Sequence, residues 1–138
     1  MKKILLVLGL VGILIGCGMK TYSPEEKREL ILKSYSDDKA TREAAAEKYY
    51  EILRELSKLE SDGNEKAHDE YKEWRSTLEK VSREVRIKRR AISKVNFRKE
   101  YNDITEEEYK KELIEATKDP EAYLDRIEKE KTTFPHFK

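Results

Sequence analysis

The chain has 138 residues, of which 43% are charged and 37% hydrophobic, and its net charge is +1. This near balance excludes bulk electrostatic attraction to nucleic acid or to an anionic membrane, and the single cysteine excludes an internal disulfide. The abundance of Glu, Lys, Arg, Leu and Ala, with only five glycines and three prolines, is typical of long helices.

The N-terminus carries the first motif. Lys2 and Lys3 precede an apolar run over residues 4–15, which is shorter than the ~20 residues needed to cross a bilayer. A charged start followed by a short apolar segment is typical of an export signal. The run ends in Leu14, Ile15, Gly16 and Cys17, and this order of residues resembles the lipobox of bacterial lipoproteins.

The resemblance implies a covalent lipid anchor. It implies diacylglyceryl transfer to the Cys17 thiol, cleavage between Gly16 and Cys17 by the lipoprotein signal peptidase, and acylation of the new amine. Two or three acyl chains hold a protein stably on a membrane. Residues 1–16 are then the signal peptide and 17–22 a lipidated tether. Gly18 implies sorting to the outer membrane if the cell has two membranes. The alternatives are an ordinary signal peptide with a chance cysteine, or a buried cysteine.

Residues 23–131 are expected to form a single all-α domain. Ser23 and Glu26 make a capping box around Pro24, which predicts a helix over residues 24–35. A second helix is predicted over residues 39–61, with its apolar residues spaced alternately by four and three positions: Ala45, Tyr49, Ile52, Leu56 and Leu59.

A third helix repeats that spacing. It is predicted over residues 64–101, with Ala67, Tyr71, Trp74, Leu78, Val81 and Val85 on its stripe. Gly63 can adopt the left-handed conformation that ends a helix, so the second and third helices should form an antiparallel, coiled-coil-like hairpin. Capping signals at Thr105 and Asp119 predict two further short helices, and residues 132–138 form an aromatic tail.

Basic residues are concentrated on the third helix. Residues 83–99 contain eight bases and one acid, whereas residues 100–130 contain twelve acids and five bases. The favoured interpretation is that the acidic helices fold back and neutralise the stripe. The alternatives are contact with an anionic lipid or glycan, or with a protein partner, through Arg83, Arg86, Arg89, Arg90 and Lys94. We expect no nucleic acid partner, because an exported protein rarely meets one.

Catalysis and cofactors are not expected. The Glu65 and His68 pair has the spacing used in di-iron bundles, but such sites need a second pair and further glutamates. The chain has no nucleophile elbow and no Gly-rich phosphate loop. Six aromatic residues stand on or beside the apolar stripes and are expected in the core: Tyr49, Tyr50, Tyr71, Trp74, Tyr109 and Tyr123.

Two functional hypotheses are favoured, and a third fits the size of the chain. The first is a non-enzymatic, lipid-anchored helical scaffold or protein-interaction module of the bacterial envelope, with helical self-association as an option. The second is a surface adhesin or host-interaction lipoprotein. For this one, residues 96–113 are similar to the second helix of the small FadA-type adhesins, which are antiparallel helical hairpins. The shared positions are Phe97, Lys99, Tyr101, Asp103, Tyr109 and Leu113. A lipoprotein that inhibits another protein fits the size equally well.

Overall fold

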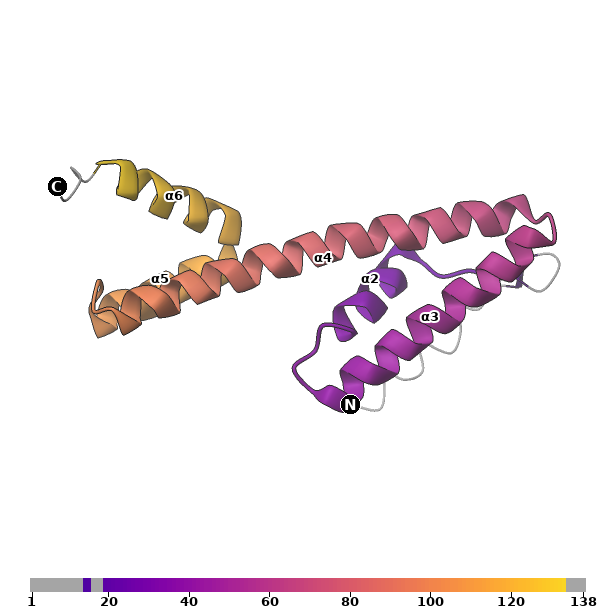
Figure 1. Ribbon diagram of the computed structural model, residues 1–138, viewed down its shortest axis with the longest axis horizontal. Coiled ribbons are helices and arrows are strands. Elements are labelled where there is room, and N and C mark those ends of the chain that lie inside the picture. Colours follow the sequence, from indigo (N-terminus) through magenta and orange to yellow (C-terminus); the bar gives the residue numbers. More distant parts are fainter. Residues whose placement is uncertain (1–13, 16–18, 134–138) are drawn as a thin grey trace. The chain divides into compact units, whose positions relative to one another are not determined.

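The computed structural model describes residues 14–15 and 19–133, and in this part of the chain the protein is all-α, as predicted (Figure 1). The helices are α2 (Pro24–Lys33), α3 (Lys39–Ser61), α4 (Glu65–Glu100), α5 (Glu106–Lys118) and α6 (Pro120–Thr133). Two short antiparallel strands, β1 (Leu14–Ile15) and β2 (Met19–Lys20), precede them. Cys17 and Gly16 lie outside the described residues, as does the aromatic segment from residue 134 onward.

The predicted capping residues and the predicted glycine turn lie at the ends of helices in the structure. Ser23 and Thr105 each form a complete capping box, at the starts of α2 and α5. Asp38 caps α3, and Gly63 turns the chain into α4 with a φ of +89°. The left-handed conformation of Asn102 was not predicted. This residue has a φ of 56° and follows the end of α4. The first helix ends at Lys33, two residues before the predicted boundary.

The chain divides into two compact units, one up to Val81 and one from Ser82 onward. The sequence pattern by itself predicts one domain over residues 23–131. Helix α4 is continuous through the division, so each unit contains part of it. Each unit has its own buried residues, and each is described below by itself.

The first unit contains the predicted antiparallel hairpin of α3 and α4 (Figure 1). The stripe residues Ala45, Tyr49, Ile52 and Leu56 are buried on α3, as Ala67, Trp74 and Val81 are on α4. Tyr50 is 61% exposed, so its expected place in the core is wrong. It lies one position beyond the stripe, where the helix turns its side chain outward.

Helix α2 contacts both helices of this hairpin, which the sequence analysis did not anticipate. Its Lys27 is 1% exposed, and its ammonium group lies 2.8 Å from Glu70 and 2.6 Å from Glu73 of α4. The same group sits 5.8 Å from the centre of the Trp74 ring. A buried lysine is tolerated because these two carboxylates pair with it.

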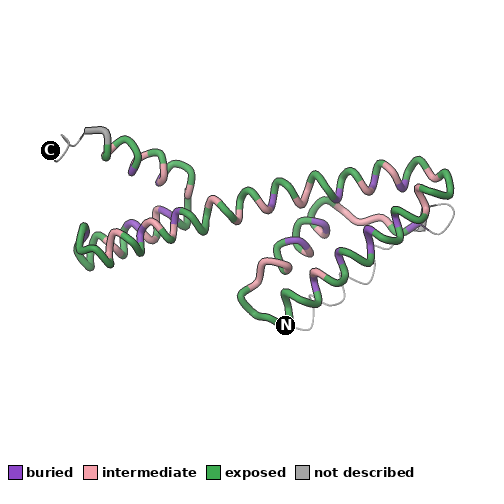
Figure 2. Tube along the Cα trace, in the orientation of Figure 1, coloured by how far each residue is buried: buried purple, intermediate pink, exposed green. Residues whose placement is uncertain are grey.

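The second unit consists of the C-terminal part of α4 with α5 and α6. Its core contains Ala91 and Val95 from α4, Ala116 from α5, and Tyr123 and Ile127 from α6. Tyr109 is half-buried against this core, as Tyr71 is in the first unit. Most residues at the start of this unit are exposed (Figure 2), namely residues 83, 84, 86 and 88–90.

Candidate anion-binding site on helices α4 and α6

The basic residues of α4 meet two different environments within the second unit. At 100° per residue, Arg83, Arg86, Arg90 and Lys94 fall on one stripe of the helix. Arg98 and Lys99 lie at the C-terminal end of α4, next to the acidic helices. The predicted neutralisation holds at that end of the helix and does not extend to the stripe.

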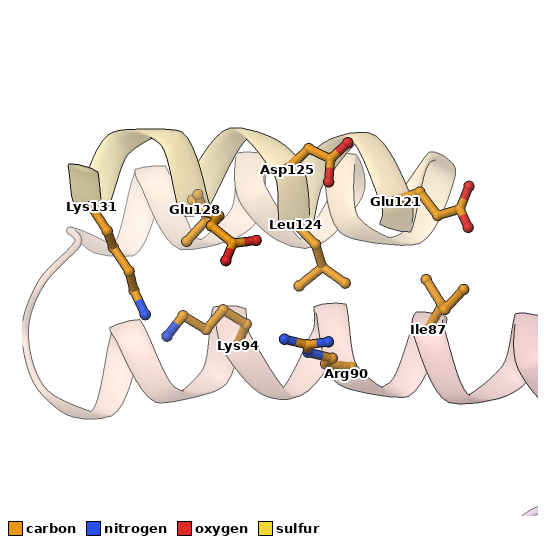
Figure 3. Close-up of a pocket in the computed structure, with 9 residues that line it drawn as sticks. Ile87, Arg90, Lys94, Glu121, Leu124, Asp125, Glu128 and Lys131 are labelled. Carbon is orange, nitrogen blue, oxygen red and sulfur yellow. The ribbon is translucent and has the colours of Figure 1, made fainter. Parts of the chain in front are cut away.

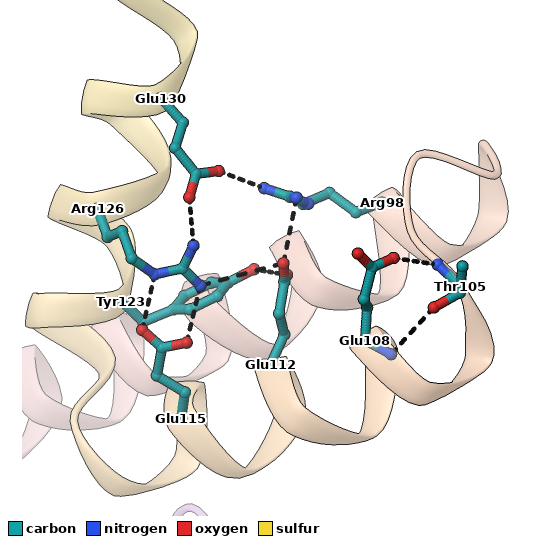
Figure 4. Close-up of polar contacts among 8 residues, drawn as sticks. All are labelled: Arg98, Thr105, Glu108, Glu112, Glu115, Tyr123, Arg126 and Glu130. Carbon is teal, nitrogen blue, oxygen red and sulfur yellow. Dashed lines mark hydrogen bonds and ion pairs between the residues drawn. The ribbon is translucent and has the colours of Figure 1, made fainter.

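Arg98 is neutralised by the acidic helices that follow it. Its guanidinium lies 3.1 Å from Glu112 of α5 and 3.3 Å from Glu130 of α6 (Figure 4). Lys99 forms an ion pair with Glu106, which lowers the pKa of that carboxyl. These contacts fasten α5 and α6 to the end of α4, so Arg98 and Lys99 serve the fold.

The same network continues through α6. Arg126 donates two hydrogen bonds to Glu115, at 2.8 and 2.7 Å, and also pairs with Glu130. The bonds with Glu115 raise the pKa of the Arg126 guanidinium. Burial raises the pKa of the Tyr123 hydroxyl, which donates to Glu112 at 2.8 Å (Figure 4). Each charge here has a partner in place, which indicates a structural network.

Three bases nearer the middle of α4 are not paired with an acid in the part of the chain that the structure describes. Arg83, Arg86 and Arg90 are exposed, and within the described residues none of them forms an ion pair. Arg89, another member of the predicted set, is exposed but is not without an interaction partner. The structure therefore leaves a stripe of positive charge available for an external ligand.

Two of these bases line a cleft between α4 and α6 (Figure 3). The cleft has a volume of about 560 Å³, and Arg90 and Lys94 line its α4 side. Lys131 of α6 points at Lys94 across the cleft (Figure 3). Lys131 lowers the pKa of Lys94, because two ammonium groups held this close repel each other.

An exposed aromatic pair adjoins the basic cleft. Phe97 and Tyr101 are 47% and 62% exposed, and their ring centres lie 4.3 Å apart. The Lys94 ammonium is 5.2 Å from the centre of the Phe97 ring, in cation–π contact. Exposed aromatic surface next to a cation is a common feature of interaction sites.

Sequence reasoning found the α4 bases but missed Lys131. Nothing local distinguishes this lysine from its neighbours on α6, and only the packing of α6 on α4 brings it to Lys94. The described residues contain no group of three or more His, Cys, Asp or Glu that could hold a metal ion. His68 pairs with Glu60 of α3. None of the described helices combines the length and apolar character needed to span a membrane.

Comparison with known proteins adds no relative: no family model, no curated protein and no solved structure matches this chain.

Proposed function

We propose that this protein is a bacterial lipoprotein that acts as a non-enzymatic, helical interaction module on the cell envelope. The observation that carries the proposal is the order Leu14, Ile15, Gly16, Cys17 directly behind a short apolar run. Lipidation also accounts for the single cysteine of an exported chain, since it consumes a thiol that would otherwise be free.

The described surface supports an interaction role. A stripe with Arg83, Arg86 and Arg90 lacks ion pairs within the described residues, and it leads to the exposed pair of Phe97 and Tyr101. Unneutralised charge steers the encounter with a partner, and exposed aromatic rings supply contact area. An envelope protein or an anionic component of the envelope is the expected partner.

The adhesin hypothesis remains the second candidate because of where these aromatic residues lie. Phe97 and Tyr101 belong to the segment that is similar to FadA-type adhesins, and both are exposed. Protease treatment of intact cells separates the two candidates. Removal of a C-terminal tag from intact cells would favour the adhesin, whereas protection until lysis would favour a scaffold that faces the periplasm.

The anchor is tested by metabolic labelling with an alkyne analogue of palmitate in bacteria that express the tagged full chain. The wild-type protein should incorporate the label, and inhibition of the lipoprotein signal peptidase should leave a larger, uncleaved form. Cys17→Ala should abolish incorporation, because the thiol is the acceptor. Lys20→Ala, an exposed change three residues further on, is the matched control and should keep the label.

Two results would refute the lipoprotein assignment. One is a Cys17→Ala protein that still incorporates palmitate, which would place the acyl chain elsewhere. The other is a wild-type protein that is exported and cleaved but never labelled, which would indicate an ordinary signal peptide.

A further inference from the structure

The cleft between α4 and α6 gathers three cations from two helices. Arg90 and Lys94 are one helical turn apart on α4, and Lys131 approaches them from the end of α6 (Figure 3). The ammonium groups of Lys94 and Lys131 point toward each other, and the Arg90 guanidinium faces the same space. Like charges gathered in this way repel each other, and an anion placed among them would remove the repulsion.

The acids that line the cleft do not supply this anion. Glu121, Asp125 and Glu128 belong to α6, yet within the described residues no ion pair within 4.0 Å joins them to the three cations. Glu121 lies at the opposite end of the cleft from Lys131, and Glu128 points into the cleft near Lys94 (Figure 3). Glu128 is therefore the acid that would compete with a bound anion.

We propose that this cleft binds a phosphate group, held by Arg90, Lys94 and Lys131. Phosphate suits the site because its several oxygens can accept from an arginine fork and two lysines at once. Ile87 and Leu124 line the same cleft, and their apolar side chains would contact the organic part of a phosphate ester. The shared ligand chemistry is therefore a phosphate ester, supplied either by a lipid headgroup or by a soluble metabolite. The inference does not depend on acylation of Cys17.

A bound anion should change the pKa of Lys94, and NMR can follow this change directly. Lys131 lowers the pKa of Lys94 in the unliganded cleft. The charged groups that face Lys94 come from α4, from the α4–α5 turn and from α6: Arg90, Arg98, Asp103, Glu128, Glu130 and Lys131. A phosphate between the two lysines would favour their charged forms and raise the pKa of Lys94.

Binding is measured by NMR titration of the ¹⁵N-labelled full-length chain, purified in a nonionic detergent, with inorganic phosphate at fixed ionic strength. Residues 87–94 and 124–131 should shift in a saturable manner, and the Lys94 resonance should report a raised pKa. Lys94→Gln and Lys131→Gln should each weaken binding about tenfold, the loss expected for one charge-assisted hydrogen bond. Glu128→Gln should strengthen binding about threefold by removing the competing acid.

Lys88→Gln is the matched control. Lys88 is an exposed base on the same helix that does not line the cleft, and its loss changes the net charge equally. It should change the affinity less than twofold. The proposal is overturned if phosphate causes no saturable shifts, or if Lys88→Gln weakens binding as much as Lys94→Gln does. It is also overturned if both lysine variants fold with wild-type helicity and still bind phosphate as the wild type does, and Glu128→Gln leaves the affinity unchanged.

A second titration distinguishes the source of the phosphate. Glycerophosphoglycerol, the headgroup of phosphatidylglycerol without acyl chains, is compared with inorganic phosphate on the same variants. Tighter binding of the diester, lost in Lys94→Gln and Lys131→Gln, would assign the cleft to a lipid headgroup. Tighter binding of inorganic phosphate would assign it to a soluble phosphate monoester.

Discussion

At the scale of single residues, the first unit depends on one buried charge. The side chain of Lys27 is 2% exposed, and that of its partner Glu70 is 11% exposed. Neither group can regain water while the helices remain packed. Such a pair adds little net stability compared with apolar residues of the same size, but removal of one member leaves the other charge buried alone.

Lys27→Met should therefore destabilise the protein by about 3 kcal/mol, because Glu70 loses the partner that makes its burial tolerable. Urea denaturation followed by Trp74 fluorescence measures the change, since Trp74 lies beside Lys27. The double variant Lys27→Met with Glu70→Leu should recover most of this loss. A single variant as stable as the wild type would show that the pair is open to solvent.

At the scale of secondary-structure elements, the capping boxes set where helices begin. The Thr105 hydroxyl accepts from the Glu108 N–H at 3.2 Å, and the Glu108 carboxylate accepts from the Thr105 N–H at 2.7 Å. The backbone bond from Thr105 holds the pKa of Glu108 below its ordinary value. This half of the box is present above the ordinary pKa of a glutamate and is lost as the pH falls through the lowered value.

Thr105→Ala should destabilise the second unit by about 1 kcal/mol, the usual cost of removing an N-cap side chain. Thermal denaturation monitored by circular dichroism measures it, with a fall in Tm of about 4 °C. Thr117→Ala is the matched control in the same helix. Thr117 is exposed and bonds the Leu113 carbonyl, so alanine should be neutral or slightly stabilising there. Equal losses in both variants would contradict a capping role.

At the scale of the whole molecule, the two compact units predict two responses to mutation. Trp74, the single tryptophan, is buried in the first unit, and Val95 is buried in the second. Contiguous parts of a protein with separate cores can unfold as separate cooperative units. Trp74 fluorescence then reports on the first unit alone, whereas helical ellipticity reports on both.

Val95→Ala should create a small cavity and destabilise the second unit by about 2 kcal/mol. The ellipticity transition in urea should begin earlier, while the midpoint of the Trp74 transition stays that of the wild type. Ile52→Ala, a cavity in the first unit, is the converse variant and should shift the Trp74 midpoint. If Val95→Ala moves the Trp74 midpoint equally, the two units unfold together.

The sequence by itself determined the features that depend on neighbours along the chain. Capping boxes at Ser23 and Thr105, the glycine turn at Gly63, and the apolar spacing of α3 and α4 are local signals, because a helix starts, ends and turns its faces by short-range rules. These signals were sufficient to predict the all-α fold and the hairpin within it. They also predict Cys17 as a lipidation site, and this residue lies outside the described part of the chain.

Only the tertiary structure decided which distant charges meet. Lys27 is buried against α4, Arg98 is neutralised, and Arg90 and Lys94 are left to face Lys131. Each outcome joins residues of different helices that are 14 or more positions apart, and a helix that packs one turn differently would exchange the partners. The choice depends on how whole helices pack, because electrostatic pairing in a protein is set by distance and burial and not by separation along the chain.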